Sequence, residues 1–153
     1  MKQSRRDILR IASVLGMAFT AGLLKPADVF AAEWSQKVFD AKSLEEVVKA
    51  LGGDAFAVST EVSVTGPEIA ENGAVVPVTI ASKAANTEYM AILVEKNPAA
   101  MSASFNIPPG SDPAFSTRVK MGATSNVHVL VKAGGKWLVA SKEIKVTLGG
   151  CGG

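Results

Sequence analysis

The sequence predicts a mainly β protein: an immunoglobulin-like antiparallel β-sandwich, with a short helical segment before it and a flexible Gly-Cys arm after it. After Asp54, seven or eight short runs rich in β-branched residues follow one another, and Gly, Pro, Asn or Asp separates them about every ten residues. Valines alternate with other residues at Val127, Val129 and Val131, which indicates sheets with one solvated face. Setting aside residues 1–31 leaves 122 of the 153 residues, enough for one domain with a continuous core.

A short helix is expected before the strands. Ser43 followed by Glu46 forms a capping-box pair, and Gly52-Gly53 ends the helix. Between these signals, apolar residues recur at helical spacing. Three apolar residues upstream either extend this stripe or form a separate turn that packs against the domain. The apolar helix residues are Leu44, Val47, Val48 and Leu51, and the upstream residues are Trp34, Val38 and Phe39.

The expected strands occupy the rest of the domain. A Gly-Gly hairpin turn at residues 133–136 joins two of them, because glycine reaches positive φ without strain. Pro77 lacks a backbone N–H and therefore indicates an edge strand or a bulge. Residues 106–112 (NIPPGSD) are interpreted as a rigid turn. The strands are expected at residues 57–64, 74–81, 87–95, 100–107, 114–121, 125–132 and 136–141, with residues 142–148 as an eighth.

Residues 1–31 have the three-part layout of an export signal. A basic stretch comes first, an apolar run at residues 11–24 follows, and small residues end the segment at Ala31. The apolar run is shorter than the roughly 20 residues that span a bilayer. Residues 4–10 (SRRDILR) resemble the twin-arginine consensus, with Ile8 in place of Phe and Arg10 in place of Lys. We therefore expect export of the folded protein to the periplasm by the twin-arginine route, with cleavage after Ala31.

Without this signal the net charge changes sign. The full chain has 16 Lys and Arg against 14 Asp and Glu, a net charge of +2. Residues 1–31 hold five of the basic and two of the acidic groups, which leaves 11 − 12 = −1 for the remainder. A charge this small gives no basis for binding nucleic acid or an anionic membrane.

The body of the chain lacks the residue sets of enzymes. The single histidine, His128, lies within an expected strand and has no Cys, His and Asp cluster around it, which favours a structural or surface role. No phosphate-binding loop, dinucleotide motif, HExxH motif or CxxC motif is present. We therefore predict no catalytic residue, no metal site and no cofactor.

The chain's one cysteine is surrounded by glycine near the C-terminus. No apolar residue follows Leu148, so burial of the thiol is not expected, and a single cysteine excludes an internal disulfide. Glycine populates positive and negative φ about equally, which gives the arm little preferred shape and minimal width. From Leu148 the thiol can reach about 10 Å, which suits insertion into narrow pockets of other proteins. The arm consists of Cys151 with Gly149, Gly150, Gly152 and Gly153.

Three other interpretations of this terminus stay open. A glycine-rich end can simply fray. Cys151 can serve only to cross-link two copies through a disulfide, although such a role needs no glycine on the far side of the cysteine. A thiol enzyme would need Cys151 and His128 to meet in space, which a flexible arm achieves poorly.

Residues 118–125 (RVKMGATS) and 145–153 (KVTLGGCGG), together with the twin-arginine signal and the sandwich-like body, resemble the SoxY family of the periplasmic Sox sulfur-oxidation system. The terminal GGCGG matches the sulfur-binding motif of that family. The resemblance implies a carrier rather than an enzyme. It implies that Cys151 holds thiosulfate-derived sulfur covalently and that the flanking glycines form the carrier arm.

The resemblance also implies partners. A second small β-sandwich subunit, SoxZ, would form a heterodimer with this chain, and a disulfide homodimer through Cys151 is a further implied state. The haem enzyme SoxXA would join thiosulfate to Cys151, and the manganese-dependent hydrolase SoxB would release sulfate. A sulfane dehydrogenase, SoxCD, would oxidise the remaining sulfur where it is present. The expected divisions are residues 1–31 for the signal, 32–148 for the sandwich and 149–153 for the arm.

Overall fold

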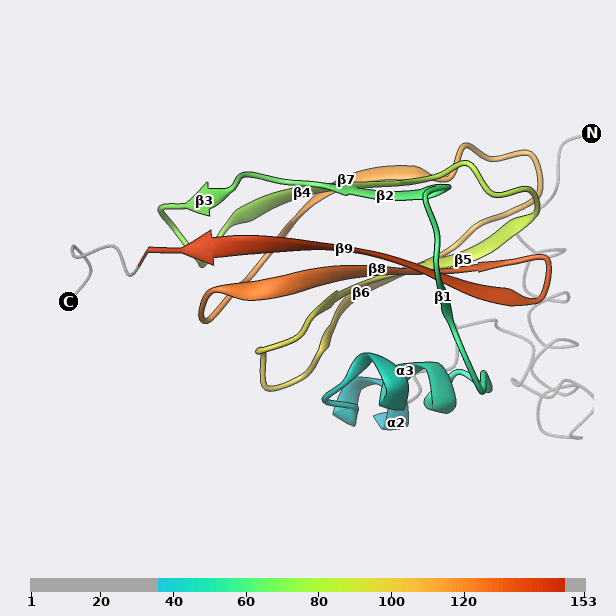
Figure 1. Ribbon diagram of the computed structural model, residues 1–153, viewed down its shortest axis with the longest axis horizontal. Helices are drawn as coiled ribbons and strands as arrows, with labels where there is room; N and C mark the ends of the chain where they lie inside the picture. The colour runs from blue at the N-terminus through green and yellow to red at the C-terminus, as the bar shows by residue number, and fades with distance from the viewer. Residues whose placement is uncertain (1–35, 148–153) are drawn as a thin grey trace, which may run out of the picture. The chain divides into compact units, whose positions relative to one another are not determined.

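The structure is a computed structural model, and it describes residues 36–147. Within this range two short helices precede nine strands (Figure 1). This mainly β organisation confirms the predicted fold class. The elements are α2 (Gln36–Asp40), α3 (Leu44–Ala50), β1 (Ala57–Val58), β2 (Val62–Thr65), β3 (Ile69–Ala70), β4 (Val76–Ser82), β5 (Thr87–Val94), β6 (Met101–Asn106), β7 (Ala114–Val119), β8 (Ser125–Ala133) and β9 (Lys136–Val146).

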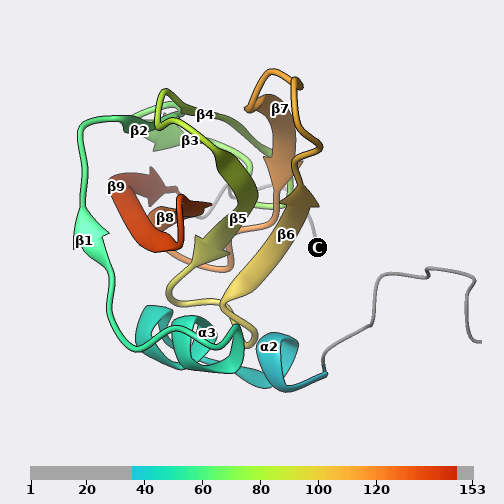
Figure 2. The ribbon, with the colours of Figure 1, turned by 90° about the vertical axis from the view of Figure 1, so that its right-hand side faces the viewer.

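The strands form two sheets that face each other (Figure 2). The larger sheet has the order β1-β9-β8-β5-β6, and β3 also pairs with β9. The smaller sheet has the order β2-β4-β7, with antiparallel ladders throughout. In the larger sheet β9, β8, β5 and β6 are antiparallel to their neighbours, whereas β1 and β3 each run parallel to β9. The fold is therefore the expected antiparallel sandwich with two short parallel additions along one edge.

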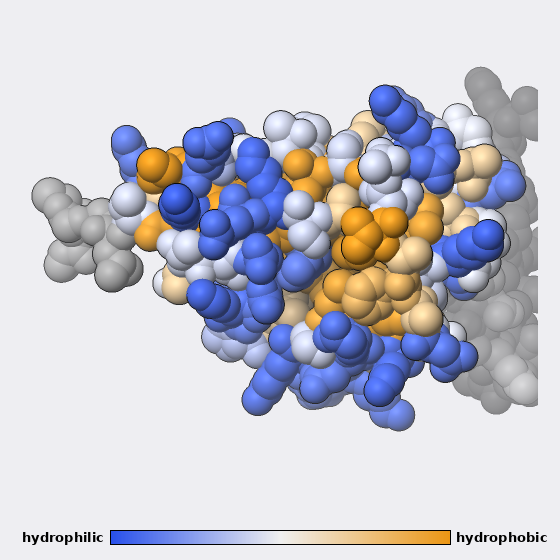
Figure 3. All heavy atoms as spheres, in the orientation of Figure 1, coloured by the Kyte–Doolittle hydropathy of each residue, from blue (hydrophilic) through white to orange (hydrophobic). Residues whose placement is uncertain are grey.

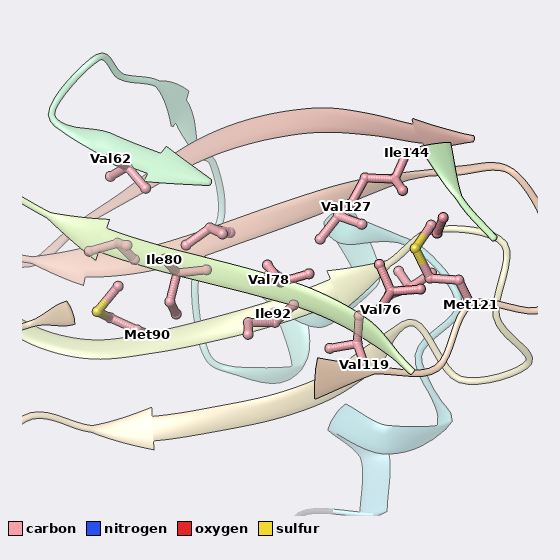
Figure 4. Packing of buried hydrophobic residues seen from close by; sticks show 14 of the residues in the cluster. Val62, Val76, Val78, Ile80, Met90, Ile92, Val119, Met121, Val127 and Ile144 are labelled. Carbon is pink, nitrogen blue, oxygen red and sulfur yellow. The ribbon is translucent and has the colours of Figure 1, made fainter. Parts of the chain in front are cut away.

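Apolar side chains fill the space between the two sheets (Figure 4). Along β4, Val76, Val78 and Ile80 are buried and alternate with exposed residues, as a strand with one solvated face requires. Ile92 and Ile144 join the same core from the larger sheet. These five side chains are at most 1% exposed, and burying one such side chain stabilises a fold by about 1.5–3 kcal/mol.

The outer face of the larger sheet is not solvated throughout, and here the expectation of one wet face was wrong. Ala91 and Leu93 of β5 and Leu130 of β8 point away from the sandwich core, yet all three are fully buried. They form a second core with Val47 and Val48 of α3. The helices lie against this face as a third layer (Figures 1 and 2).

The helix signals are confirmed. The Glu46 N–H donates to the Ser43 Oγ at 3.2 Å, and the Glu46 carboxylate in turn accepts the Lys42 N–H at 2.8 Å. Gly52 has a φ of 80°, the left-handed conformation that ends many helices. Upstream, α2 forms a separate turn in which Val38 is buried, so the second of the two interpretations is correct. Trp34 lies outside the described residues.

The strand boundaries differ from the prediction in three places. The run at residues 57–64 contains two strands, because β1 pairs with β9 whereas β2 crosses to the smaller sheet. The separate strands expected at residues 136–141 and 142–148 form one strand, β9, since β8 pairs with it from Lys136 to Ile144 without a break. Strand β3 was not predicted.

The predictions made from the Gly-Gly pair and from Pro77 can be checked against backbone angles and strand register. Gly134 and Gly135 have φ values of 53° and 76°, which confirms the hairpin between β8 and β9. Pro77 was predicted to mark an edge strand or a bulge, and this was wrong, because it lies in β4, the middle strand of its sheet, and pairs with Arg118 of β7 in regular register. However, the ladder with β2 stops at Thr79, so Pro77 has a strand partner on one side only. Its missing N–H therefore costs no ladder hydrogen bond on that open side.

Candidate functional site at the end of strand β9

The residues predicted to carry the function lie outside the described residues. These are Cys151, Gly149, Gly150, Gly152 and Gly153. The structure describes the segment that leads to them, the end of β9 at Val146 and the following Thr147 (Figure 1). Cys151 comes four residues after Thr147, so the cysteine cannot be farther than about 14 Å from Thr147 at 3.3–3.6 Å per residue.

Strand β3 holds one edge of this segment. Its two residues pair in parallel with β9, Ile69 with Lys145 and Ala70 with Val146. The Lys145 N–H donates to the Glu68 carbonyl at 2.9 Å, and the Thr147 N–H donates to the Ala70 carbonyl at 3.1 Å. The strand conformation is therefore maintained by backbone hydrogen bonds up to the last described residue.

Thr124 holds the opposite edge. The ladder between β8 and β9 stops at the pair of Ser125 with Ile144, which leaves the next backbone groups of β9 without a strand partner on that side. The Val146 N–H donates to the Thr124 Oγ1 at 2.9 Å, and the Thr124 hydroxyl donates to the Val146 carbonyl at 3.4 Å. A side-chain hydroxyl thus replaces the missing ladder partner.

A close approach of Gly73 joins these two edges. A Cβ at Gly73 would lie 2.5 Å from the Met121 carbonyl oxygen and 2.8 Å from a Val146 methyl group, so only glycine fits. The Met121 N–H donates to the Gly73 carbonyl at 2.7 Å. We call residues 68–70, Gly73, Met121 and Thr124 the collar. The collar holds the end of β9 in place up to Thr147.

Asn97 fixes the turn that carries Thr124. Its side-chain amide donates to the Lys120 carbonyl at 2.7 Å and accepts the Gly122 N–H at 3.2 Å. The collar was not predicted from the sequence, because each of its contacts joins residues that are far apart in the chain. Met121 and Thr124 do belong to the segment 118–125 that carried the family resemblance, and this was the one available signal.

Charges of both signs surround the collar. Lys120, Lys145, Glu68 and Glu71 are all exposed, and their charges sum to zero. Such a surface produces no strong field of one sign that would steer a charged partner.

His128 lies on the outer face of the larger sheet. Its Nδ1 is 2.7 Å from the Ser141 Oγ, and its Nε2 is 3.8 Å from the Glu95 carboxylate. Burial lowers the pKa of His128, while the carboxylates of Glu95 and Glu45 act in the opposite direction. Because both ring nitrogens already face protein groups, His128 is not poised to act as a general base.

The described residues can be checked for clusters of metal-binding side chains and for helices that could cross a bilayer. No group of three or more His, Cys, Asp or Glu side chains between residues 36 and 147 could hold a metal ion. In the same range, neither helix has the length and apolar character needed to cross a bilayer.

Comparisons with known proteins identify relatives of this chain. Residues 47–151 match the family model described as sulfur oxidation protein SoxY. The sulfur carrier protein SoxY from Chlorobium limicola f thiosulfatophilum is 40% identical with a TM-score of 0.63, and the match covers 69% of this chain and 96% of that one. A superoxide reductase (neelaredoxin) from Ignicoccus hospitalis is 17% identical over 56% of this chain and 79% of its own, with a TM-score of 0.50, which indicates a shared fold alone. No curated protein sequence matches.

Proposed function

Because this chain belongs to the SoxY family of sulfur-oxidation proteins, we propose that Cys151 is the residue on which sulfur is carried as a covalent adduct. The family is part of the periplasmic Sox system, and its role is that of a sulfur carrier and not of an enzyme. The observation that best supports Cys151 is that the match to the family continues through residue 151. The collar supports the same proposal, since it holds the base of the predicted arm in one place.

The proposed loading step is an oxidation at sulfur. The Cys151 thiolate and thiosulfate form a new S–S bond, giving Cys–S–S–SO₃⁻, and two electrons pass to a haem enzyme of the SoxXA kind. The thiolate is the reactive form of cysteine. We assign activation of the sulfur to the partner enzyme.

The proposed unloading step is a hydrolysis. Water attacks the terminal sulfonate sulfur, the bond from that sulfur to the inner sulfur breaks, and sulfate, two protons and the Cys151 persulfide anion, Cys–S–S⁻, are formed. A hydrolase of the SoxB kind would catalyse this step. A SoxCD-type dehydrogenase, where present, would accept six electrons from the persulfide sulfur while three water molecules supply its oxygens, giving Cys–S–SO₃⁻ and six protons. A second hydrolysis would then release sulfate and the Cys151 thiolate. The same thiol must therefore enter several different active sites, and glycines on both sides of it add no width to the arm.

Three further parts of the proposal concern assembly and location. The chain would pair with a SoxZ-type subunit, and two copies would also form a disulfide homodimer through Cys151, with two electrons and two protons passing to an oxidant of the periplasm. Residues 1–31 would direct twin-arginine export, leaving the sandwich at 32–148 and the arm at 149–153. Replacing Arg5 and Arg6 with Lys should retain the precursor in the cytoplasm, and normal export of that variant would exclude the route.

Mass spectrometry of the native protein tests the carrier proposal. In cells grown on thiosulfate, Cys151 should carry reducible thiosulfonate or persulfide adducts. Cys151→Ser should abolish thiosulfate-dependent sulfate formation and leave the fold and the contact with the SoxZ-type subunit intact. Detection of free thiol and simple disulfide dimer alone, together with normal turnover by Cys151→Ser, would favour the alternative of an interaction module that uses Cys151 only as a cross-link.

A further inference from the structure

A hollow of about 570 Å³ lies at the hairpin end of β9, at the opposite end of that strand from the collar (Figure 1). The loop that follows α3 forms one side of it, and the β8–β9 hairpin forms the other. Its volume is in the range of pockets that bind small molecules. We call it the hairpin hollow. Its lining includes Asp54, Phe56, Lys132, Lys136, Trp137 and Leu138.

The indole of Trp137 brings an unpaired hydrogen-bond donor to the hairpin hollow. Trp137 is only 8% exposed and packs into the second core, where its ring stands edge-on to Tyr89 at 6.1 Å. The ring edge that carries Nε1 lies against Gly53, where any Cβ would overlap it. No described residue accepts a hydrogen bond from this N–H. Because no unexposed side chain in the described range has a fully buried nitrogen or oxygen without a partner, Nε1 must reach solvent, and it does so at the hollow that Gly53 lines.

Two lysines place positive charge beside this donor. Lys132 lies opposite Trp137 in the β8–β9 ladder, and its Nζ is 5.8 Å from the centre of the indole ring. Lys136 follows the hairpin turn and is exposed. Within the range that the structure describes, neither lysine forms an ion pair. Asp54 is exposed and is the one acidic residue of the lining, so the charges of the hairpin hollow sum to +1.

Apolar side chains supply the other walls of the hairpin hollow. Phe56 and Leu138 are both half-buried there. Strand β1 contributes Ala57 to the lining, and Figure 3 shows apolar atoms gathered over β1 with hydrophilic atoms around them. An inorganic oxyanion such as sulfate would fill only a small part of this volume and leave the apolar walls in water. An anion with an apolar body matches both kinds of surface.

We propose that the hairpin hollow binds a small organic acid as its anion. The carboxylate accepts hydrogen bonds from the Trp137 Nε1–H, which can only donate, and from the two lysines. The apolar body of the ligand lies against Phe56 and Leu138. The site is about 30 Å from the collar along β9, so it goes beyond the proposed carrier function and does not depend on it.

Nuclear magnetic resonance of the ¹⁵N-labelled full chain tests the site directly, because the Trp137 indole N–H gives its own signal. The chain has two tryptophans, so Trp34 supplies an internal reference, and Trp137→Phe identifies which signal is which. The probe is 3-phenylpropionate, added under reducing conditions that keep Cys151 as a thiol. The Trp137 signal should shift downfield and saturate, with half-saturation at a few millimolar, as expected for a ligand of about ten non-hydrogen atoms.

An uncharged ligand and charge-removing variants test the recognition of the anion. The amide 3-phenylpropanamide has the same body without the charge and should bind about tenfold more weakly. Lys132→Gln with Lys136→Gln should weaken binding of 3-phenylpropionate about tenfold, because two charged donors are lost while most of each aliphatic stem stays. The matched control is Lys83→Gln with Lys96→Gln. It removes the same charge from two exposed lysines outside the lining, and it should leave the affinity unchanged.

Four results would overturn the inference. A Trp137 signal that does not move would show that only water occupies the hairpin hollow. Equal binding of the amide would exclude recognition of the charge, and an equal loss in the control variant would assign the effect to net charge alone. Saturation by sodium sulfate at lower concentration than by 3-phenylpropionate would assign the hollow to an inorganic ion. The comparison of acid with amide uses the parent protein, so it decides the question even if a lysine variant fails to fold.

Discussion

The hydroxyl of Thr124 provides the most direct test of how the base of the arm is held. Its Oγ1 accepts the Val146 N–H at 2.9 Å and donates to the Val146 carbonyl at 3.4 Å. Thr124→Val keeps the shape of the side chain and removes both hydrogen bonds. The backbone bonds from Lys145 and Thr147 to the β3 segment remain. We therefore expect local opening at the end of β9 while the rest of the sandwich stays folded.

The free-energy change caused by Thr124→Val can be estimated from the two hydrogen bonds that it removes. A typical hydrogen bond contributes about 0.5–1.5 kcal/mol, and a buried donor left without a partner costs about 1–3 kcal/mol. Thr124 and Val146 are both partly exposed, so water can satisfy the freed groups in part. We therefore expect Thr124→Val to destabilise the end of β9 by about 1 kcal/mol, at the lower end of these ranges. That cost raises the fraction of molecules with an open strand end about fivefold.

Amide hydrogen exchange measures this fraction directly. The Val146 amide should exchange about fivefold faster in Thr124→Val, while amides in the centre of β8 should keep their rates. Thr147→Val is the matched control, because it removes only a 3.4 Å side-chain hydrogen bond to the Ala70 carbonyl and retains the backbone bond. The reasoning is refuted if Val146 shows no acceleration, if both variants accelerate it equally, or if the acceleration extends along all of β8.

Three further predictions concern stability and transfer. Gly73→Ala would place a Cβ 2.5 Å from the Met121 carbonyl oxygen and should lower the melting temperature by several degrees. Gly122→Ala, which meets nothing closer than 3.9 Å, should not lower it, and equal melting temperatures would contradict the close approach. Burial lowers the pKa of His128 in the folded protein. Below a pH of about 6.5 the unfolded chain therefore binds more protons than the folded one. The free energy of unfolding should consequently fall as the pH drops through that value. Denaturant titrations across this range should show a smaller pH dependence for His128→Asn, and an unchanged dependence would exclude His128 as the cause. Gly150→Val should slow transfer by the conjugating enzyme at an unchanged melting temperature, because a wider arm docks less readily; unaltered kinetics would show that arm width is unimportant.

The sequence was sufficient to predict the sandwich but not its outer layer. Residues 90–94 are an unbroken apolar run, and all five are buried, as in a strand covered on both faces. This run was counted as a strand, and the helix that covers its outer face was identified separately, yet the two were not connected. Strand β3 was missed for a different reason. Two residues between Glu68 and Glu71 are too few to show any periodicity, and only the pairing with Lys145 and Val146 makes them a strand.

The same holds for the site: the sequence reveals features that depend on neighbouring residues and misses those that depend on residues far apart in the chain. Cys151 could be singled out because a lone cysteine among glycines is visible in the sequence. The collar could not, since the Thr124 contact joins residues 22 positions apart and the Thr147 contact with Ala70 joins residues 77 positions apart. Gly73 shows the limit most clearly. Its sequence neighbourhood resembles any turn, and the requirement for glycine comes from Met121 and Val146, which the fold brings against it.

A carrier thiol has two opposing requirements, and the collar explains how one chain can meet both. A longer arm reaches deeper active sites, but ordering each additional residue on docking costs about 1–2 kcal/mol of backbone entropy. If residues 145–147 came loose, three more residues would have to be ordered at each docking event, at a cost of about 3–6 kcal/mol, or at least a hundredfold in affinity. The hydrogen bonds that the β9 N–H groups donate to the Glu68 carbonyl, the Ala70 carbonyl and the Thr124 hydroxyl prevent this loss by keeping β9 formed up to Thr147. If several enzymes act in turn on the proposed arm, a loose end of β9 should lower the affinity of every docking step by the same factor, because each step would have to order the same three residues.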